Sequence, residues 1–133
     1  MVASLQTTEQ LLNEFQKNKS WDKQYKLIIQ LGKKLPEMDA KDKIETNLVQ
    51  GCESLAWLVI NKEGDLYNFK MDSDTRVVKG LMMILLIIYQ GKNAEQIRNF
   101  DIQDYFTQLG LLNHLSPSRS NGLSAIIEQI QRG

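Results

Sequence analysis

Cysteine and histidine each occur once in this chain of 133 residues, and proline occurs twice. A single cysteine cannot form an internal disulfide or supply a cysteine-rich metal cage. Neither sign of charge is in excess, because 16 basic and 16 acidic residues give a formal net charge of zero. This balance argues against non-specific attraction to nucleic acid or to an anionic membrane surface. We therefore expect no metal site, no nucleic-acid partner and no membrane partner.

Long hydrophobic runs are also missing. The longest apolar run, residues 81–89, is far shorter than the ~20 residues that a membrane-spanning helix needs. Residues 1–6 lack the basic segment and apolar core of a secretory signal. The length suits one domain, residues 1–133, that buries roughly two thirds of its unfolded surface. We expect a single-domain protein of the reducing cytoplasm.

Helix signals are present at both ends of the chain. Thr7 and Gln10 form a capping box before a short apolar stripe, and Ser20 is expected to cap a second helix that ends at Gly32. Ser116 is expected to cap the last helix, since a proline follows it at the first helical position. Two short helices are expected at residues 94–99 and 102–109, before the last one.

The middle of the chain predicts a small antiparallel sheet and a buried helix. Residues 47–50 suit a short strand, residues 55–61 a strand buried on both faces, and residues 66–71 a return strand after a turn at 62–65. Residues 77–89 are apolar nearly all round, as expected of a central helix. The predicted fold class is α+β, with a sheet of about three strands packed against several helices.

Cys52 follows Gly51 at the point where a polar segment meets an apolar run. A buried cysteine that fills apolar space is one interpretation. The polar neighbours Gln50, Glu53 and Ser54 favour the other, a thiol presented on a turn. No lysine or arginine lies close in sequence, and the Glu53 carboxylate disfavours the thiolate, so Cys52 is not strongly self-activated. Such a thiol suits sulfur exchange, in which a persulfide is the stored product.

Other residues leave alternatives open. A Cys52–His114 dyad for acyl transfer would need the two side chains to meet in the fold, which the sequence does not establish. Asp72 and Asp74 could bind a metal, but with Ser73 they suit the N-cap of the central helix better. Arg119, near the start of the last helix, is either solvated or binds a carboxylate or a partner.

Several motifs in this order resemble the SufE family. They cover nearly the whole chain beyond residue 20: WDKQYKLII at 21–29, LGK at 31–33, VQGCES at 49–54 with Trp57, DSD at 72–74, VKGL at 78–81, NFD at 99–101, LGL at 109–111 and HLSPSRSNGL at 114–123. The resemblance implies an α+β fold similar in shape to the IscU-type scaffold proteins.

The family also implies a function. Cys52 would be the sulfur acceptor for a cysteine desulfurase of the SufS or CsdA type, which this protein would stimulate before passing the sulfur to a SufBCD-type iron–sulfur scaffold. The pyridoxal phosphate would belong to the desulfurase, with no cofactor on this chain, which would be an accessory protein rather than an independent enzyme. A homodimer is left open. A thiol redox sensor and a non-catalytic helical interaction module are the alternatives.

The resemblance carries over to five further residues. Gly51 and Glu53 would belong to the cysteine loop, while Ser73, Asp74 and Arg119 would lie near that loop or on the surface facing the desulfurase. Glu53 stands where some relatives, such as the CsdE branch, have glutamine. The choice between the SufE and CsdE branches therefore stays open.

Overall fold

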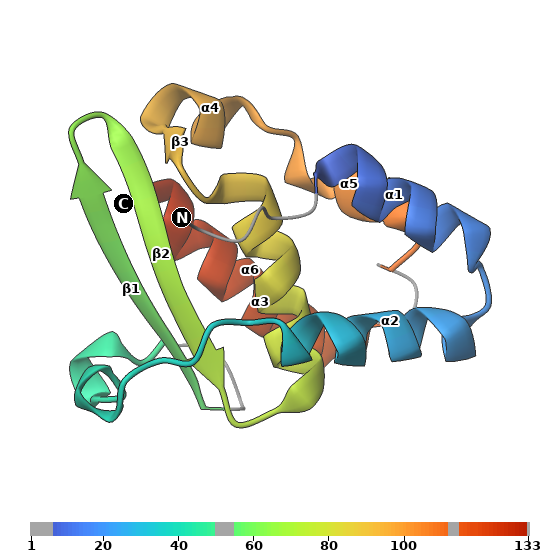
Figure 1. Cartoon of the computed structure of the whole chain (residues 1–133), viewed down its shortest axis with the longest axis horizontal. Helices are drawn as coiled ribbons and strands as arrows, with labels where there is room; N and C mark the ends of the chain where they lie inside the picture. The colour runs from blue at the N-terminus through green and yellow to red at the C-terminus, as the bar shows by residue number, and fades with distance from the viewer. Residues whose placement is uncertain (1–6, 50–54, 112–114, 133) are drawn as a thin grey trace.

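The computed structural model describes residues 7–49, 55–111 and 115–132, and the findings below concern these ranges. They contain six helices and a three-stranded antiparallel sheet, which confirms the predicted α+β class. Figure 1 shows the long hairpin at one side of the molecule and the helices gathered beside it. The elements in chain order are α1 (Thr8–Lys17), α2 (Trp21–Lys33), the 3-10 turns η1 (Ala40–Asp42) and η2 (Glu45–Asn47), β1 (Ala56–Glu63), β2 (Leu66–Ser73), α3 (Arg76–Tyr89), β3 (Lys92–Asn93), α4 (Ala94–Asn99), α5 (Ile102–Leu109) and α6 (Pro117–Arg132).

The sheet has the order β1-β2-β3. The hairpin pairs Ala56 with Ser73 at one end and Glu63 with Leu66 at the other, so its loop has two residues. The first of them, Gly64, has a φ of +60°, a value that glycine adopts without strain and that type II′ hairpin loops require. The hairpin was predicted, but both strands are longer than expected.

The third strand differs from the expectation. Residues 47–50 were predicted as a strand, yet Glu45–Asn47 is a 3-10 turn, and of the described residues 48 and 49 the first makes an isolated bridge to Trp57. Residue 50 lies outside the described residues. The sheet is completed instead by β3, which pairs with β2 directly after α3 ends. The prediction of a strand buried on both faces is also wrong in part. Leu55 is 48% exposed, and buried and half-buried residues alternate along β1 from Ala56.

Helix α3 is the centre of the core, as its apolar sequence predicts. All of its residues except Arg76 and Lys79 are buried, and α2 packs along it. A Cβ atom added at Gly80 would overlap the backbone and side chain of Ile28, so glycine permits this close helix crossing. Gly32 lies in the same crossing, where an added Cβ would be 3.0 Å from the Arg76 carbonyl oxygen. Helix α2 does not end at this glycine but continues to Lys33. The expected C-cap role of Gly32 is therefore wrong.

Most predicted helix caps are confirmed. Thr7 and Gln10 form the capping box of α1, the Ser20 side chain caps α2, and the Arg119 N–H donates to Ser116 Oγ at the start of α6. Gly110 ends α5 in the left-handed conformation.

The prediction that residues 72–74 cap the central helix is wrong. Asp72 and Ser73 pair with Trp57 and Ala56 in the hairpin, so β2 runs through Ser73 and the N-cap position of α3 falls to Thr75.

None of the helices described is long and apolar enough to span a membrane.

Candidate functional site

Cys52, Gly51 and Glu53 lie outside the residues that the structure describes, as does His114. The described residues on either side of the Cys52 segment are held together. The Val49 N–H donates to the Ala56 carbonyl oxygen at 2.8 Å, and Leu48 forms its bridge with Trp57. Val49 is 5% exposed, so this junction is anchored in the core.

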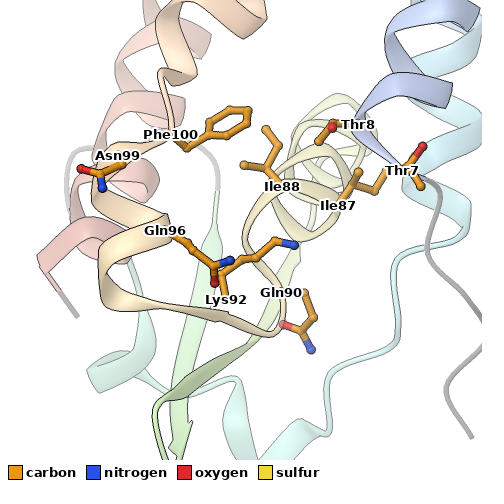
Figure 2. A pocket seen from close by; sticks show the side chains of 9 residues that line it. All are labelled: Thr7, Thr8, Ile87, Ile88, Gln90, Lys92, Gln96, Asn99 and Phe100. Carbon is orange, nitrogen blue, oxygen red and sulfur yellow. The ribbon is translucent and has the colours of Figure 1, made fainter.

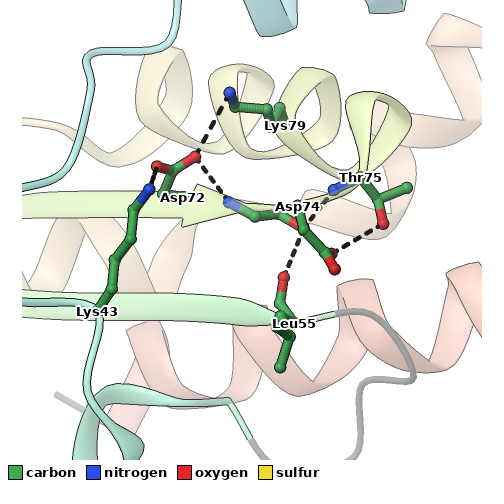
Figure 3. A network of polar contacts seen from close by, with 7 residues as sticks. Lys43, Leu55, Asp72, Asp74, Thr75 and Lys79 are labelled. Carbon is green, nitrogen blue, oxygen red and sulfur yellow. Dashed lines mark hydrogen bonds and ion pairs between the residues drawn. The ribbon is translucent and has the colours of Figure 1, made fainter. Parts of the chain in front are cut away.

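Ser73 fixes the residue that follows this segment. Its Oγ donates to the Leu55 carbonyl oxygen at 2.6 Å and accepts the Thr75 N–H at 3.2 Å. The Asp74 N–H donates to the same Leu55 carbonyl oxygen at 3.3 Å, so two donors hold one acceptor. Figure 3 shows Leu55 next to the start of β1, facing the turn between β2 and α3. Ser73 and Asp74 therefore both bind Leu55, the first described residue after Cys52.

Asp72 forms a second polar cluster beside this anchor. Its carboxylate is 3.0 Å from Lys43 Nζ and 3.6 Å from Lys79 Nζ, and it accepts the Ser73 N–H at 2.8 Å. Burial by itself raises the pKa of the Asp72 carboxyl. The hydrogen bonds from Lys43 and Ser73 and the positive charges outweigh burial, so the pKa lies below the ordinary value of 3.8.

Lys43 is the residue that sequence reasoning missed in this cluster. It lies in the segment between η1 and η2, and its ammonium also stands over the Trp57 ring, 5.6 Å from the ring centroid. This contact ties the segment after α2 to the hairpin. The sequence showed only a charged stretch there, and nothing in that stretch identified a partner 29 residues away.

Arg119 does not take part in the hydrogen bonds that hold Leu55. It is half-buried in the first turn of α6, and its Nη1 atom is buried without a hydrogen-bond partner among the described residues. Within the same part of the chain it forms no hydrogen bond or ion pair with Ser73 or Asp74. The burial of Nη1 argues against a fully solvated guanidinium.

A cationic cleft lies where the end of α2 meets the start of α3. Its volume is about 290 Å³, and it is lined by Ile29, Gly32, Lys33, Arg76 and Lys79. Lys79 pairs with Asp72, whereas Lys33 and Arg76 are exposed and form no ion pair within the described residues. No acidic side chain lines the cleft, which can therefore attract an anionic group.

Metal ligands do not gather in the part of the chain that the structure describes, since no group of three or more His, Cys, Asp or Glu side chains is found there. The polar groups around Leu55 act as hydrogen-bond donors to the backbone, and this use suits the positioning of a chain segment. The arrangement can hold both ends of the Cys52 segment, with cations close by.

Comparison with known proteins identifies the family. Residues 9–133 match the SufE family, whose description is an Fe–S metabolism associated domain. An uncharacterized SufE-like protein of Rhizobium meliloti (strain 1021) is 40% identical over 127 residues, which cover 92% of this chain and 91% of the relative. The solution structure of a hypothetical protein from Thermus thermophilus superposes with a TM-score of 0.75 over 94% of this chain and 90% of that one, and its 18% identity shows likeness of fold alone. The chain belongs to the SufE family and carries a domain associated with iron–sulfur metabolism.

Proposed function

We propose that this protein accepts sulfur on Cys52 from a cysteine desulfurase of the SufS or CsdA type, stimulates that enzyme and passes the sulfur to an iron–sulfur scaffold of the SufBCD type. Membership of the SufE family supports the proposal, and Cys52 is the one thiol in the sequence. The observation that carries it is the anchoring of Leu55 by Ser73 and Asp74 directly after the Cys52 segment.

The anchoring matters because sulfur transfer depends on how a thiol is presented. The Val49–Ala56 hydrogen bond fixes the chain before the segment, and the two donors to Leu55 fix it afterwards. Together they define where the five residues between them start and end. Fixed ends favour sulfur transfer, because they limit the positions from which a thiol between them can approach a protein that carries a reactive sulfur.

The transfer step conserves atoms and electrons. The Cys52 thiolate attacks the outer sulfur of the persulfide on the desulfurase cysteine, forming a new S–S bond as the old one breaks. The desulfurase cysteine leaves as a thiolate and takes up a proton, and Cys52 becomes a persulfide. No external oxidant is needed. Because no lysine or arginine lies close to Cys52 in the sequence, we assign the activating positive field to the desulfurase, whose pyridoxal phosphate remains with that enzyme.

The test uses the Cys52→Ser variant. After incubation with a desulfurase and free cysteine, the wild-type protein should gain sulfur by intact mass, in a form that a thiol reductant removes. The serine variant should fold and bind the desulfurase but gain none, and the wild-type protein without cysteine is the control. Sulfur found on the serine variant would show that another group accepts it, and the assignment of Cys52 would be wrong.

The reaction of the wild-type protein with peroxide distinguishes sulfur transfer from the redox-sensor alternative. A sensor thiol reacts with peroxide unaided and forms a sulfenic acid. We expect Cys52 to react slowly with dilute peroxide and faster with the desulfurase persulfide. The opposite order would favour a sensor.

A further inference from the structure

A cavity of about 600 Å³ opens at the far end of α3 from Leu55 and Ser73. The 14 residues of α3 make it about 20 Å long, so the cavity is well separated from Leu55 and Ser73. Its volume lies within the range of small-molecule sites. Figure 2 shows the lining side chains, which come from the start of α1, the end of α3, and β3 with α4: Thr7, Thr8, Ile87, Ile88, Gln90, Lys92, Gln96, Asn99 and Phe100.

The floor of this cavity is apolar and well supported. Ile87 and Ile88 are 8% and 3% exposed in the last turns of α3. Phe100 is packed edge-on against Tyr89 and Tyr105, with ring centroids 6.1 and 5.5 Å apart. The floor can therefore receive a short hydrocarbon group without rearrangement.

The two glutamines on the rim are oriented by the backbone. Gln90 Oε1 accepts the Phe69 N–H at 2.7 Å, and Gln96 Oε1 accepts the Asn93 N–H at 3.0 Å in the capping box of α4. Each amide oxygen is thus engaged, which leaves the two NH2 groups to donate. Figure 2 shows the Gln96 amide beside Lys92, whereas the Gln90 amide points away from it, so Gln96 supplies the donors next to the lysine.

Lys92 supplies the charge. Figure 2 shows its side chain directed into the space that the other lining residues surround. No acidic side chain lines the cavity, and Lys92 forms no ion pair among the residues described. One ammonium beside amide donors matches a single negative charge, and a carboxylate accepts such donors at both oxygens.

We propose that this cavity binds a small organic monocarboxylate, with its carboxylate at Lys92 and Gln96 and its hydrocarbon group on Ile87, Ile88 and Phe100. The site is independent of Cys52 and of sulfur transfer. The ligand class follows from the single cation, the donor-rich rim and the apolar floor, since each recognises a different part of such a molecule.

The test follows the amide and methyl signals of the isotope-labelled full chain by NMR as hexanoate is added. Hexanoate at up to about 20 mM should shift the signals of Ile87, Ile88 and Lys92 in a saturable way, because a ligand of this size binds weakly. Hexan-1-ol and hexylammonium have the same chain without the negative charge and should bind at least about tenfold more weakly. Equal binding of the alcohol, or no saturable shift with hexanoate, overturns the proposal.

Two variants sharpen the result. Lys92→Met keeps the length of the side chain and removes its charge, so hexanoate affinity should fall about tenfold. Gln96→Glu retains the acceptor for the Asn93 N–H, and hence the cap of α4, but places a carboxylate beside the ligand and should weaken binding at least as much. Lys26→Met, at an exposed position on α2, is the matched control and should bind like the wild type. Unchanged affinity in both cavity variants would contradict the site.

Discussion

Asp72 is a charged residue on β2 that is buried, with only 4% of its surface exposed. Two lysines from different segments, Lys43 and Lys79, reach it, and each keeps more than a third of its side chain in water. The carboxylate is therefore the desolvated member of the cluster, and both cations, together with the Ser73 N–H, favour its ionised form. Its neutralisation would leave the lysines in solvent but would weaken the hold on the segment after α2.

The pH dependence of stability should reveal this carboxylate. The pKa of Asp72 is lower in the folded protein than its ordinary value of 3.8, because the cations and hydrogen bonds outweigh burial. Its contribution is therefore complete above 3.8 and is lost as the pH falls through the lower folded value. Asp72→Asn should lower the free energy of unfolding by about 2 kcal/mol near pH 7.

Urea denaturation from about pH 7 to about pH 3 measures this effect. The gap between wild type and Asp72→Asn should be widest near neutral pH and should narrow on the acid side. Asp39→Asn, at an exposed position before η1 where the side chain makes no cap hydrogen bond, is the matched control for the change of aspartate to asparagine and should not show the same narrowing. A gap that stays constant at low pH would mean that the charge of Asp72 does not stabilise the fold.

At the scale of elements, the α2–α3 crossing depends on Gly80. An added Cβ would meet the Ile28 carbonyl oxygen and side chain, and the Ile28 carbonyl carbon at 2.8 Å. Backbone atoms cannot move aside as a flexible side chain can, so the helices would have to separate. Gly80→Ala should lower the free energy of unfolding by about 3 kcal/mol.

Gly91→Ala is the matched comparison for this prediction. Gly91 has a φ of +73° and open space around its Cα, so alanine there meets conformational strain alone, about 1 kcal/mol. Thermal or urea unfolding of both variants gives the ranking. A smaller loss for Gly80→Ala than for Gly91→Ala would show that the crossing tolerates a wider spacing.

Sequence patterns predicted the elements whose signals are local. The caps at Thr7, Ser20 and Ser116 involve residues three positions apart, and each was predicted correctly. Gly32 was interpreted as a helix end because its contact with α3 lies more than 40 residues away. Asp72 and Ser73 look like caps in isolation, but their pairing with β1 extends the strand through them.

The candidate site divides in the same way. Cys52 was singled out as the one cysteine, placed after a glycine where a polar segment meets an apolar run, and the resemblance gave it a role. Ser73 and Asp74 came from the resemblance alone, and their bonds to Leu55 position the first described residue after Cys52. Lys43 and Lys92 could not be found from sequence, since their roles depend on Asp72 and on a cavity assembled from three parts of the chain. Arg119 keeps a buried Nη1 atom that its neighbours in sequence do not explain.

At the scale of the whole molecule, a chain with no net charge nevertheless places cations together at one end of α3. Figure 1 shows the end of α2, the start of α3 and the lower end of the hairpin close to one another. Lys33 and Arg76 project there without acidic partners in the described part of the chain. Arg76 follows Asp74 by two residues, and the Asp74 N–H binds Leu55, so a partner that reached Leu55 would lie close to these charges.

This charge distribution leads to a prediction that rests on the proposed function. If a desulfurase docks at this end, acidic groups on it should approach the cationic cleft, because opposite charges steer association. The double variant Lys33→Glu/Arg76→Glu should raise the concentration needed for half-maximal stimulation about tenfold at low salt, with little change in the maximal rate. The difference should shrink at about 0.5 M salt, since screening removes charge steering between exposed groups.

Lys17→Glu/Lys23→Glu is the matched control, with two exposed lysines of α1 and α2 that do not line the cleft. It carries the same change in net charge, so a similar loss would mean that overall charge matters and the cleft does not. The persulfide formed on Cys52 of the cleft variant should also be measured at high protein concentration. If it reaches the wild-type amount there, the variant has lost docking affinity and has kept the transfer reaction. A cleft variant that stimulates as well as the wild type at low salt would place the docking surface on another face, while leaving the role of Cys52 intact.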